Sequence, residues 1–110
     1  MSAITTHILD TSRGLPAAGV RVSLEVRFPD GAWKQLGRGV TDADGRAGSL
    51  LGDGASLAEG VYRLTFDTRA YMPEGLYPEV NVTFQVRDAA RHYHIPLLLG
   101  PFGYTTYRGS

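Results

Sequence analysis

Five residues of this 110-residue chain stand out for the chemistry they could do. His7 lies in the stretch THILD, Arg46 follows a glycine in DADGR, His92 and His94 are two positions apart in HYH, and Ser110 ends the chain. Imidazoles titrate near neutral pH and can activate water. A guanidinium can grip planar carbonyl or enolate oxygens and stabilise negative charge as it develops. Together these side chains suit the hydrolysis of a polar, electron-rich ring, although they do not identify the substrate.

A metal site is the main chemical alternative for the histidines. Side chains two apart on a strand leave the same face, so His92 and His94 could point at one ion. A structural zinc site needs further ligands, the chain has no cysteine, and no fixed spacing makes His7 a third ligand. We therefore do not expect a metal site. The sequence also lacks the Gly-x-Ser-x-Gly elbow of common serine hydrolases and a glycine-rich phosphate loop.

Alternating apolar and polar residues predict that strands position these groups. Such alternation is clearest over residues 20–28, 61–67 and 80–86, and Asp-Gly and proline-containing turns separate the segments. The stretch TRAYMPEGLYPE, residues 68–79, has room for one helical turn before its prolines. The side chains predicted to face inward are Val20, Val22, Leu24, Val26, Phe28, Val61, Leu64, Phe66, Val80, Val82, Phe84 and Val86.

The spacing of these segments indicates the fold class. We count about seven or eight short strands, roughly ten residues apart, which is typical of a β-sandwich. Repeats, low-complexity tracts and linkers are absent from the sequence. The chain is therefore predicted to be all-β, mostly antiparallel, and one domain over residues 1–110.

Charge and hydropathy exclude several classes of partner. Eleven basic and eleven acidic residues leave no net charge, so neither nucleic acid nor an anionic membrane is expected as a partner. The longest apolar segment, IPLLLGPF, is too short to cross a bilayer. The first residues lack the pattern of a signal peptide, and the absence of cysteine is compatible with a reducing compartment. We therefore expect a cytoplasmic protein.

Three segments carry a resemblance to a known family. They are THILDTSRGLPAAGVRVSL, TDADGR and HYHIPLLLGPFGYTTYRGS. The chain resembles the transthyretin-related proteins, in the branch that hydrolyses 5-hydroxyisourate and ends in Tyr-Arg-Gly-Ser. The hormone-carrying branch lacks that ending and the matching histidines. The resemblance covers essentially the whole chain.

The resemblance implies a fold, an assembly and a reaction. The implied fold is a transthyretin-like sandwich of two four-stranded sheets with one short helix. The implied assembly is a homotetramer with active sites in a channel at the dimer–dimer interface. The implied reaction opens 5-hydroxyisourate, a small molecule, to 2-oxo-4-hydroxy-4-carboxy-5-ureidoimidazoline in urate catabolism, without a metal or cofactor.

The resemblance also assigns roles to individual residues. The implied catalytic residues are His7, Arg46, His94 and Ser110, and the implied substrate contacts are His7, Arg46 and Tyr107. The roles of His92 and Arg108 stay open, as does the choice of histidine as general base. The final residues, GYTTYRGS, are expected to form a last strand that delivers the terminus into a cleft shared with a neighbouring subunit.

Two other functions fit the same fold. A non-enzymatic carrier would hold a small hydrophobic or hormone-like ligand in the central channel, whose walls would then be apolar. A module that binds only other proteins would leave the histidines, the arginine and the serine without a role. The polar character of these residues favours the hydrolase.

Overall fold

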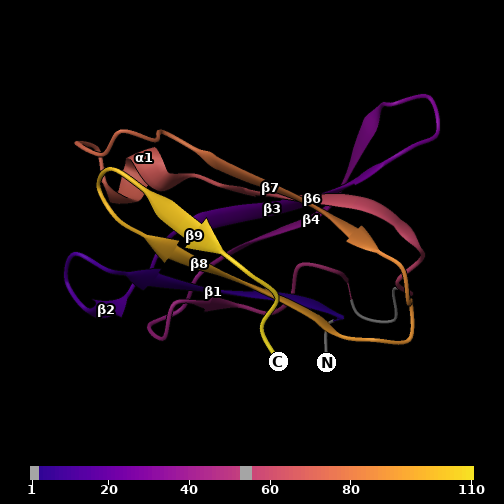
Figure 1. Ribbon diagram of the computed structural model, residues 1–110, viewed down its shortest axis with the longest axis horizontal. Helices are drawn as coiled ribbons and strands as arrows, with labels where there is room; N and C mark the ends of the chain where they lie inside the picture. The colour runs from indigo at the N-terminus through magenta and orange to yellow at the C-terminus, as the bar shows by residue number, and fades with distance from the viewer. Residues whose placement is uncertain (1–2, 53–55) are drawn as a thin grey trace.

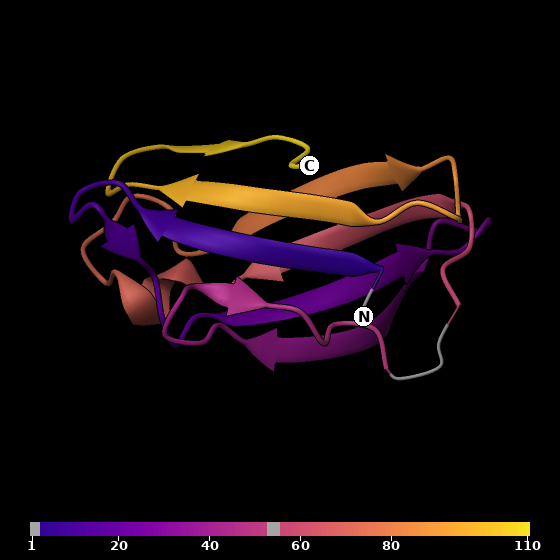
Figure 2. The same ribbon diagram turned by 90° about the horizontal axis from the view of Figure 1, so that it is seen from below.

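The computed structural model describes residues 3–52 and 56–110, which form two β-sheets packed face to face (Figures 1 and 2). The first sheet has the strand order β2-β1-β8-β9, and β5 also pairs with β1. Its strands are β1 (Ile4–Asp10), β2 (Leu15–Pro16), β5 (Arg46–Ala47), β8 (Tyr93–Leu99) and β9 (Tyr104–Thr106).

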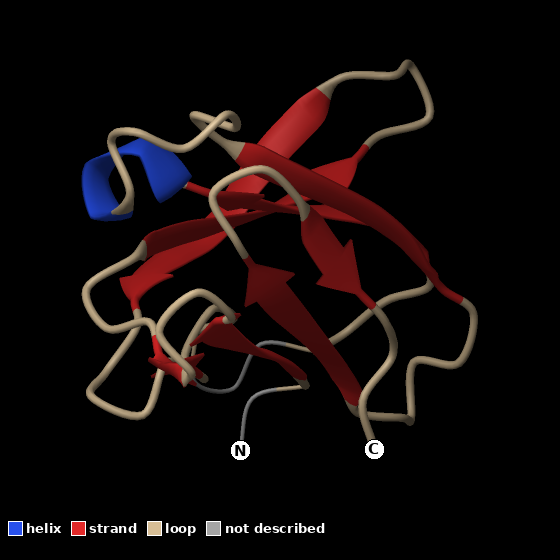
Figure 3. Ribbon diagram, turned by 60° about the vertical axis from the view of Figure 1, so that its left-hand side comes forward, coloured by secondary structure: helices blue, strands red, loops and turns tan. Residues whose placement is uncertain are grey.

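The second sheet is a plain antiparallel layer in the order β4-β3-β6-β7. Its strands are β3 (Arg21–Arg27), β4 (Trp33–Val40), β6 (Gly60–Phe66) and β7 (Val80–Val86). The single turn of helix, α1 (Thr68–Tyr71), follows β6 at one end of the sandwich (Figure 3). It begins where Asp67 accepts a hydrogen bond from the Ala70 backbone N–H. The predicted β-sandwich and the predicted helical turn are both confirmed.

Two features of the first sheet differ from the expectation. It has five strands instead of four, because the two-residue strands β2 and β5 pair with different parts of the same edge of β1. The central pair β1–β8 is parallel, whereas every other strand pair in the described residues is antiparallel. Parallel pairing of segments almost a whole chain apart leaves no local signal in the sequence.

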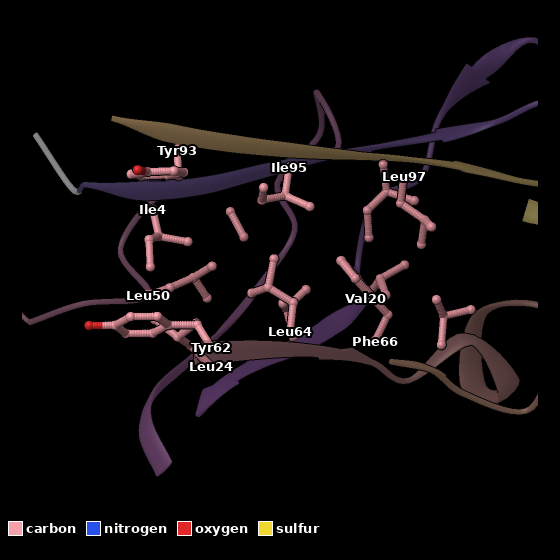
Figure 4. Packing of buried hydrophobic residues seen from close by; sticks show 14 of the residues in the cluster. Ile4, Val20, Leu24, Leu50, Tyr62, Leu64, Phe66, Tyr93, Ile95 and Leu97 are labelled. Carbon is pink, nitrogen blue, oxygen red and sulfur yellow. The ribbon is translucent and has the colours of Figure 1, made fainter. Parts of the chain in front are cut away.

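The core fills the space between the sheets, and Figure 4 shows its central side chains. Each strand contributes alternate residues, since successive side chains point to opposite faces. The fully buried large side chains include Ile4 and Ile8 of β1, Leu97 and Leu99 of β8, and Leu24, Leu64 and Phe66 of the opposite sheet. Burying each contributes about 1.5–3 kcal/mol.

Two of the predicted inward residues lie elsewhere. In β6 the buried partner of Leu64 and Phe66 is Tyr62, and Val61 points to the other face. Phe28 is 44% exposed because β3 ends at the residue before it. Its backbone N–H donates to the Ala32 carbonyl across the predicted Asp-Gly turn, at 2.7 Å, so the chain reverses direction there.

Helices in the described part of the chain are too short to cross a membrane.

Candidate active site

His7 and Arg46 face each other across two neighbouring strands. The antiparallel register of β1 and β5 pairs His7 with Arg46 and Thr6 with Ala47. Thr6 and Ala47 are buried, so His7 and Arg46 point to the outer face of the sheet. His7 is half-buried there and Arg46 is exposed.

A tight turn holds Arg46 in this register. The Asp42 carboxylate accepts hydrogen bonds from the backbone N–H groups of Asp44 and Arg46, at 2.9 and 3.0 Å. The bond from Arg46 is the largest influence that lowers the pKa of Asp42. Gly45 has a φ of 78°, and a Cβ there would lie 2.4 Å from the Ile8 carbonyl oxygen. Only glycine fits this position, which explains the glycine before Arg46.

His94 joins the same face from the other side of β1. The parallel register of β1 and β8 pairs His94 with Thr5, two residues before His7. Thr5 Oγ1 lies 2.8 Å from His94 Nδ1 and 2.9 Å from His92 Nε2. The two imidazole rings are 6.4 Å apart, centre to centre. The geometry thus gathers His7, Arg46 and His94 on three adjacent strands, with His92 and Thr5 beside them.

The surroundings of His94 keep its ring neutral. Partial burial lowers the pKa of His94, and the positive charges of Arg46, His92 and His7 lower it further. A histidine whose pKa lies below its ordinary value is unprotonated at neutral pH. It can therefore accept a proton from water.

The C-terminal segment packs against His94. After β9, which is antiparallel to β8, the Gly109 backbone N–H donates to the His94 carbonyl at 2.8 Å. A Cβ on Gly109 would lie 2.6 Å from His94 Cδ2 and 3.2 Å from Pro96 Cγ. The imidazole of His94 therefore packs closely against Gly109, and glycine is needed here because a side chain would clash with the ring.

Ser110 and Tyr107 occupy two separate places. Ser110 is exposed and borders a hollow of about 440 Å³ together with His92 and Arg108, within the size range of ligand pockets. Tyr107 is 54% exposed and lines a different groove with Phe84 at the open side of the sandwich. Within the single chain, Ser110 shares its hollow with His92, whereas the groove that Tyr107 lines has no histidine among its lining residues.

Arg108 anchors the tail. Its guanidinium stacks 4.3 Å from the centre of the Tyr93 ring and donates a long hydrogen bond to the His92 carbonyl at 3.4 Å. A cation over an aromatic face is an attractive contact. These contacts hold the segment that carries Gly109 and Ser110, and they give Arg108 a structural role.

Thr5 and Gly109 are the site residues that sequence reasoning missed. Alternation along THILD, extended one residue upstream, places Thr5 on the face of His7. That signal was readable. The contact of Thr5 with two histidines was not, because it depends on the parallel pairing of β1 with β8.

A metal centre has no support in the described residues. Residues 3–52 and 56–110 hold no group of three or more His, Asp or Glu side chains arranged to bind an ion. The side chains offer a neutral imidazole that can accept a proton, a guanidinium that can bind an anion, and hydroxyl groups that can donate or accept hydrogen bonds.

Comparison with known proteins places these residues in a family. The sequence model of the HIUase/Transthyretin family matches residues 4–109. A 5-hydroxyisourate hydrolase of Mus musculus is 42% identical, over 99% of this chain and 96% of that protein. One of Salmonella typhimurium is 44% identical, over 97% of this chain and 80% of that protein. The uric acid degradation bifunctional protein of Arabidopsis thaliana is 46% identical over 97% of this chain, which spans only 37% of that relative.

Solved structures agree on the fold. Klebsiella pneumoniae 5-hydroxyisourate hydrolase superposes with a TM-score of 0.84 and 38% identity, covering 100% of both chains. Sea bream transthyretin in complex with thyroxine superposes with a TM-score of 0.90 and 36% identity, covering 97% of this chain and 94% of that one. A 5-hydroxyisourate hydrolase and a transthyretin that binds thyroxine thus share this fold, so fold alone does not separate the two functions. The chain belongs to the HIUase/Transthyretin family.

Proposed function

We propose that this chain is a hydrolase that opens the ring of 5-hydroxyisourate in urate degradation, as a single transthyretin-like domain over residues 1–110. The observation that carries the proposal is the convergence of His7, Arg46 and His94 on one outer sheet face. A carrier of apolar ligands gains nothing from two imidazoles and a guanidinium at that position. The relatives at 42% and 44% identity named above are 5-hydroxyisourate hydrolases.

His94 is the general base in this proposal. Its lowered pKa keeps the ring neutral. Because Nδ1 is hydrogen-bonded to Thr5, Nε2 is the nitrogen that accepts the proton of the attacking water. The water attacks the carbonyl carbon of the ring amide. His7 binds the substrate from the adjacent strand, where it faces Arg46.

Arg46 holds the substrate and stabilises the oxyanion. Water attack places negative charge on the former carbonyl oxygen, and a preorganised cation lowers the barrier to that step. A guanidinium also grips two oxygens of a planar ring at once. The Asp42 turn fixes the backbone of Arg46, so less conformational entropy is lost when the side chain binds the substrate.

The tail completes the site in this proposal. Ser110, at the hollow beside His92, orients the attacking water or an imidazole. Tyr107 contacts substrate, and because it lines a separate groove in its own chain, it does so in the site of a neighbouring subunit.

We further propose a homotetramer with active sites at the dimer–dimer interface. β9 and β7 lie at sheet edges, and an unpaired edge strand is a template for pairing with another chain. Large apolar side chains at Leu15, Leu76 and Phe102 are 51%, 60% and 77% exposed. Sedimentation equilibrium decides the point: a mass near one chain would contradict the tetramer.

A cytoplasmic location is also part of the proposal. The chain has no cysteine and therefore no disulfide, which is compatible with a reducing compartment. Fractionation of cells that express the protein tests the location, and recovery outside the cytoplasm would contradict it.

The decisive experiment for the reaction is a spectroscopic assay. Urate oxidase generates 5-hydroxyisourate in situ, and its decay is followed with and without this protein. We expect a decay that accelerates in proportion to protein concentration. Decay at the spontaneous rate, from folded protein, would refute the hydrolase.

A further inference from the structure

One hydroxyl connects two imidazoles in the candidate active site. Thr5 Oγ1 lies 2.8 Å from His94 Nδ1 and 2.9 Å from His92 Nε2, both within hydrogen-bonding distance. The parallel register places Thr5 beside His94. His92 lies two residues before His94, so its side chain points to the same face of the sheet. Each contact uses one nitrogen of its ring. His94 Nε2 is left for the substrate side.

The number of protons available restricts how the Thr5 hydroxyl can bond to the rings of His92 and His94. A hydroxyl has one proton, so Thr5 donates to one ring and accepts from the other when both rings are neutral. If Thr5 donates to His92, then His94 carries its proton on Nδ1 and Nε2 is bare. If Thr5 donates to His94, then Nε2 carries the proton and the ring cannot act as a base there. Only the first arrangement serves the hydrolysis proposed above.

We propose that Thr5 is a positioning residue that fixes His94 as the Nδ1–H tautomer and links it to His92 in a proton relay. The proposal rests on the proposed function. As water attacks, its O–H bond breaks, the oxygen lone pair bonds to the carbonyl carbon, and the proton goes to His94 Nε2. The Nδ1 proton then passes to Thr5 Oγ1, and the hydroxyl proton of Thr5 passes to His92 Nε2. The carbonyl π electrons move to the oxygen as the water attacks. When this oxyanion re-forms the carbonyl, the C–N bond of the ring breaks, and the reverse transfer delivers the proton from His94 Nε2 to the leaving ring nitrogen.

Charge gives the relay a direction. His94 is half-buried, and the charges of Arg46 on β5, of His92 and of His7 on β1 add to burial in disfavouring a cation on its ring. His92 is exposed, and water screens a positive charge there, although Arg91 and Arg108 border the same hollow. The Asp42 carboxylate interacts electrostatically with Arg46 and His7. The relay moves positive charge from the crowded ring to the solvated one.

The tautomer of His94 is a direct test. In the folded protein with ¹⁵N-labelled histidine, the nitrogen chemical shifts of each ring report which nitrogen carries the proton. We expect His94 to be protonated on Nδ1 above its pKa, and Thr5→Val to shift the ring toward the Nε2–H form. An Nε2–H tautomer in the wild type, or a tautomer unchanged by Thr5→Val, would overturn the proposal.

Kinetics test the link to His92. We expect Thr5→Val to lower kcat about 10–100-fold with little change in KM, which is the usual scale for removing a group that orients a catalytic one. Thr5→Ser should restore most of the rate. His92→Asn should lower the rate alone and cost nothing more when added to Thr5→Val, because the relay is already broken. If the double variant lost kcat by the product of the two single-variant factors, the two residues would act independently, which would contradict the relay.

Thr65→Val is the matched control. Thr65 lies on the outer face of the other sheet and donates one hydrogen bond to Asn81 at 2.8 Å. Thr65→Val therefore removes the same hydroxyl group as Thr5→Val, but at a position distant from the candidate site. Its kcat should equal that of the wild type. The tautomer measurement needs no turnover. A wild type that hydrolyses no 5-hydroxyisourate but keeps the Thr5-dependent tautomer would refute the function alone.

Discussion

The two faces of strand β1 follow the same alternation and do opposite work. Ile4 and Ile8 point inward and are completely buried against the opposite sheet. Thr5 and His7 point outward, where they meet His94 and Arg46 from the neighbouring strands. One seven-residue segment therefore builds part of the core and part of the candidate site.

The comparison shows why this strand positions chemistry well. Its backbone is held on both edges, by β8 on one side and by β2 and β5 on the other, and its inner face is anchored in the core. Side chains on its outer face therefore start from a rigid base, which reduces the ordering needed at the moment of reaction. A slip of one residue would exchange the two faces and destroy both.

The largest effect is expected on the outer face. His94→Asn removes the proposed general base, and we expect kcat/KM to fall by roughly 10²–10⁴. The free energy of unfolding should change little, because the ring lies outside the core. Steady-state kinetics with urea unfolding measure both quantities. A variant that keeps the wild-type rate would remove His94 from the mechanism and leave His7 as the base.

The inner face should respond in stability instead of rate. Ile8→Ala removes a fully buried side chain, and we expect a loss of about 2–5 kcal/mol in the free energy of unfolding. Well below its melting temperature the variant should keep most of its kcat. If kcat fell as far as in His94→Asn while stability stayed unchanged, the proposed division between the two faces would be wrong.

The tail contact should give a smaller effect that is still confined to the site. Gly109→Ala places a methyl group 2.6 Å from His94 Cδ2, so the ring or the tail must shift. A displacement of about 1 Å can cost on the order of 10²-fold in rate. Gly103→Ala is the matched control, because a Cβ there meets no heavy atom within 4 Å. Equal rates for the two variants would show that Gly109 does not hold the ring.

How much of this could be read from the sequence depends on the range of each interaction. Alternation is local, so the sandwich, the helical turn and most inward residues followed from the residue pattern. The alternation alone does not predict which face Val61 takes or that β3 ends before Phe28, because both depend on pairing with a neighbouring strand. The residue types alone single out the histidines and Arg46 as able to do chemistry, but no local pattern predicts the register that places His7 opposite Arg46 and His94 opposite Thr5. The bond from Thr5 to His94 spans 89 residues and required the β1–β8 pairing.

The finest prediction concerns the charge that reaches His94 across β1. Arg46 is among the causes that lower the pKa of His94, after burial of the ring. Arg46→Gln removes that positive charge, so protonated His94 becomes less unfavourable and its pKa should rise. A raised pKa leaves fewer neutral His94 rings at a given pH. As the pH is lowered, any residual activity of the variant should therefore begin to fall at a higher pH than that of the wild type. An NMR titration of the His94 ring measures the shift, with Arg38→Gln on β4 of the other sheet as the control that should leave it unchanged. A His94 pKa that stays put or falls in Arg46→Gln would mean that the guanidinium does not face the ring, and the substrate clamp proposed for Arg46 would lose its geometric basis.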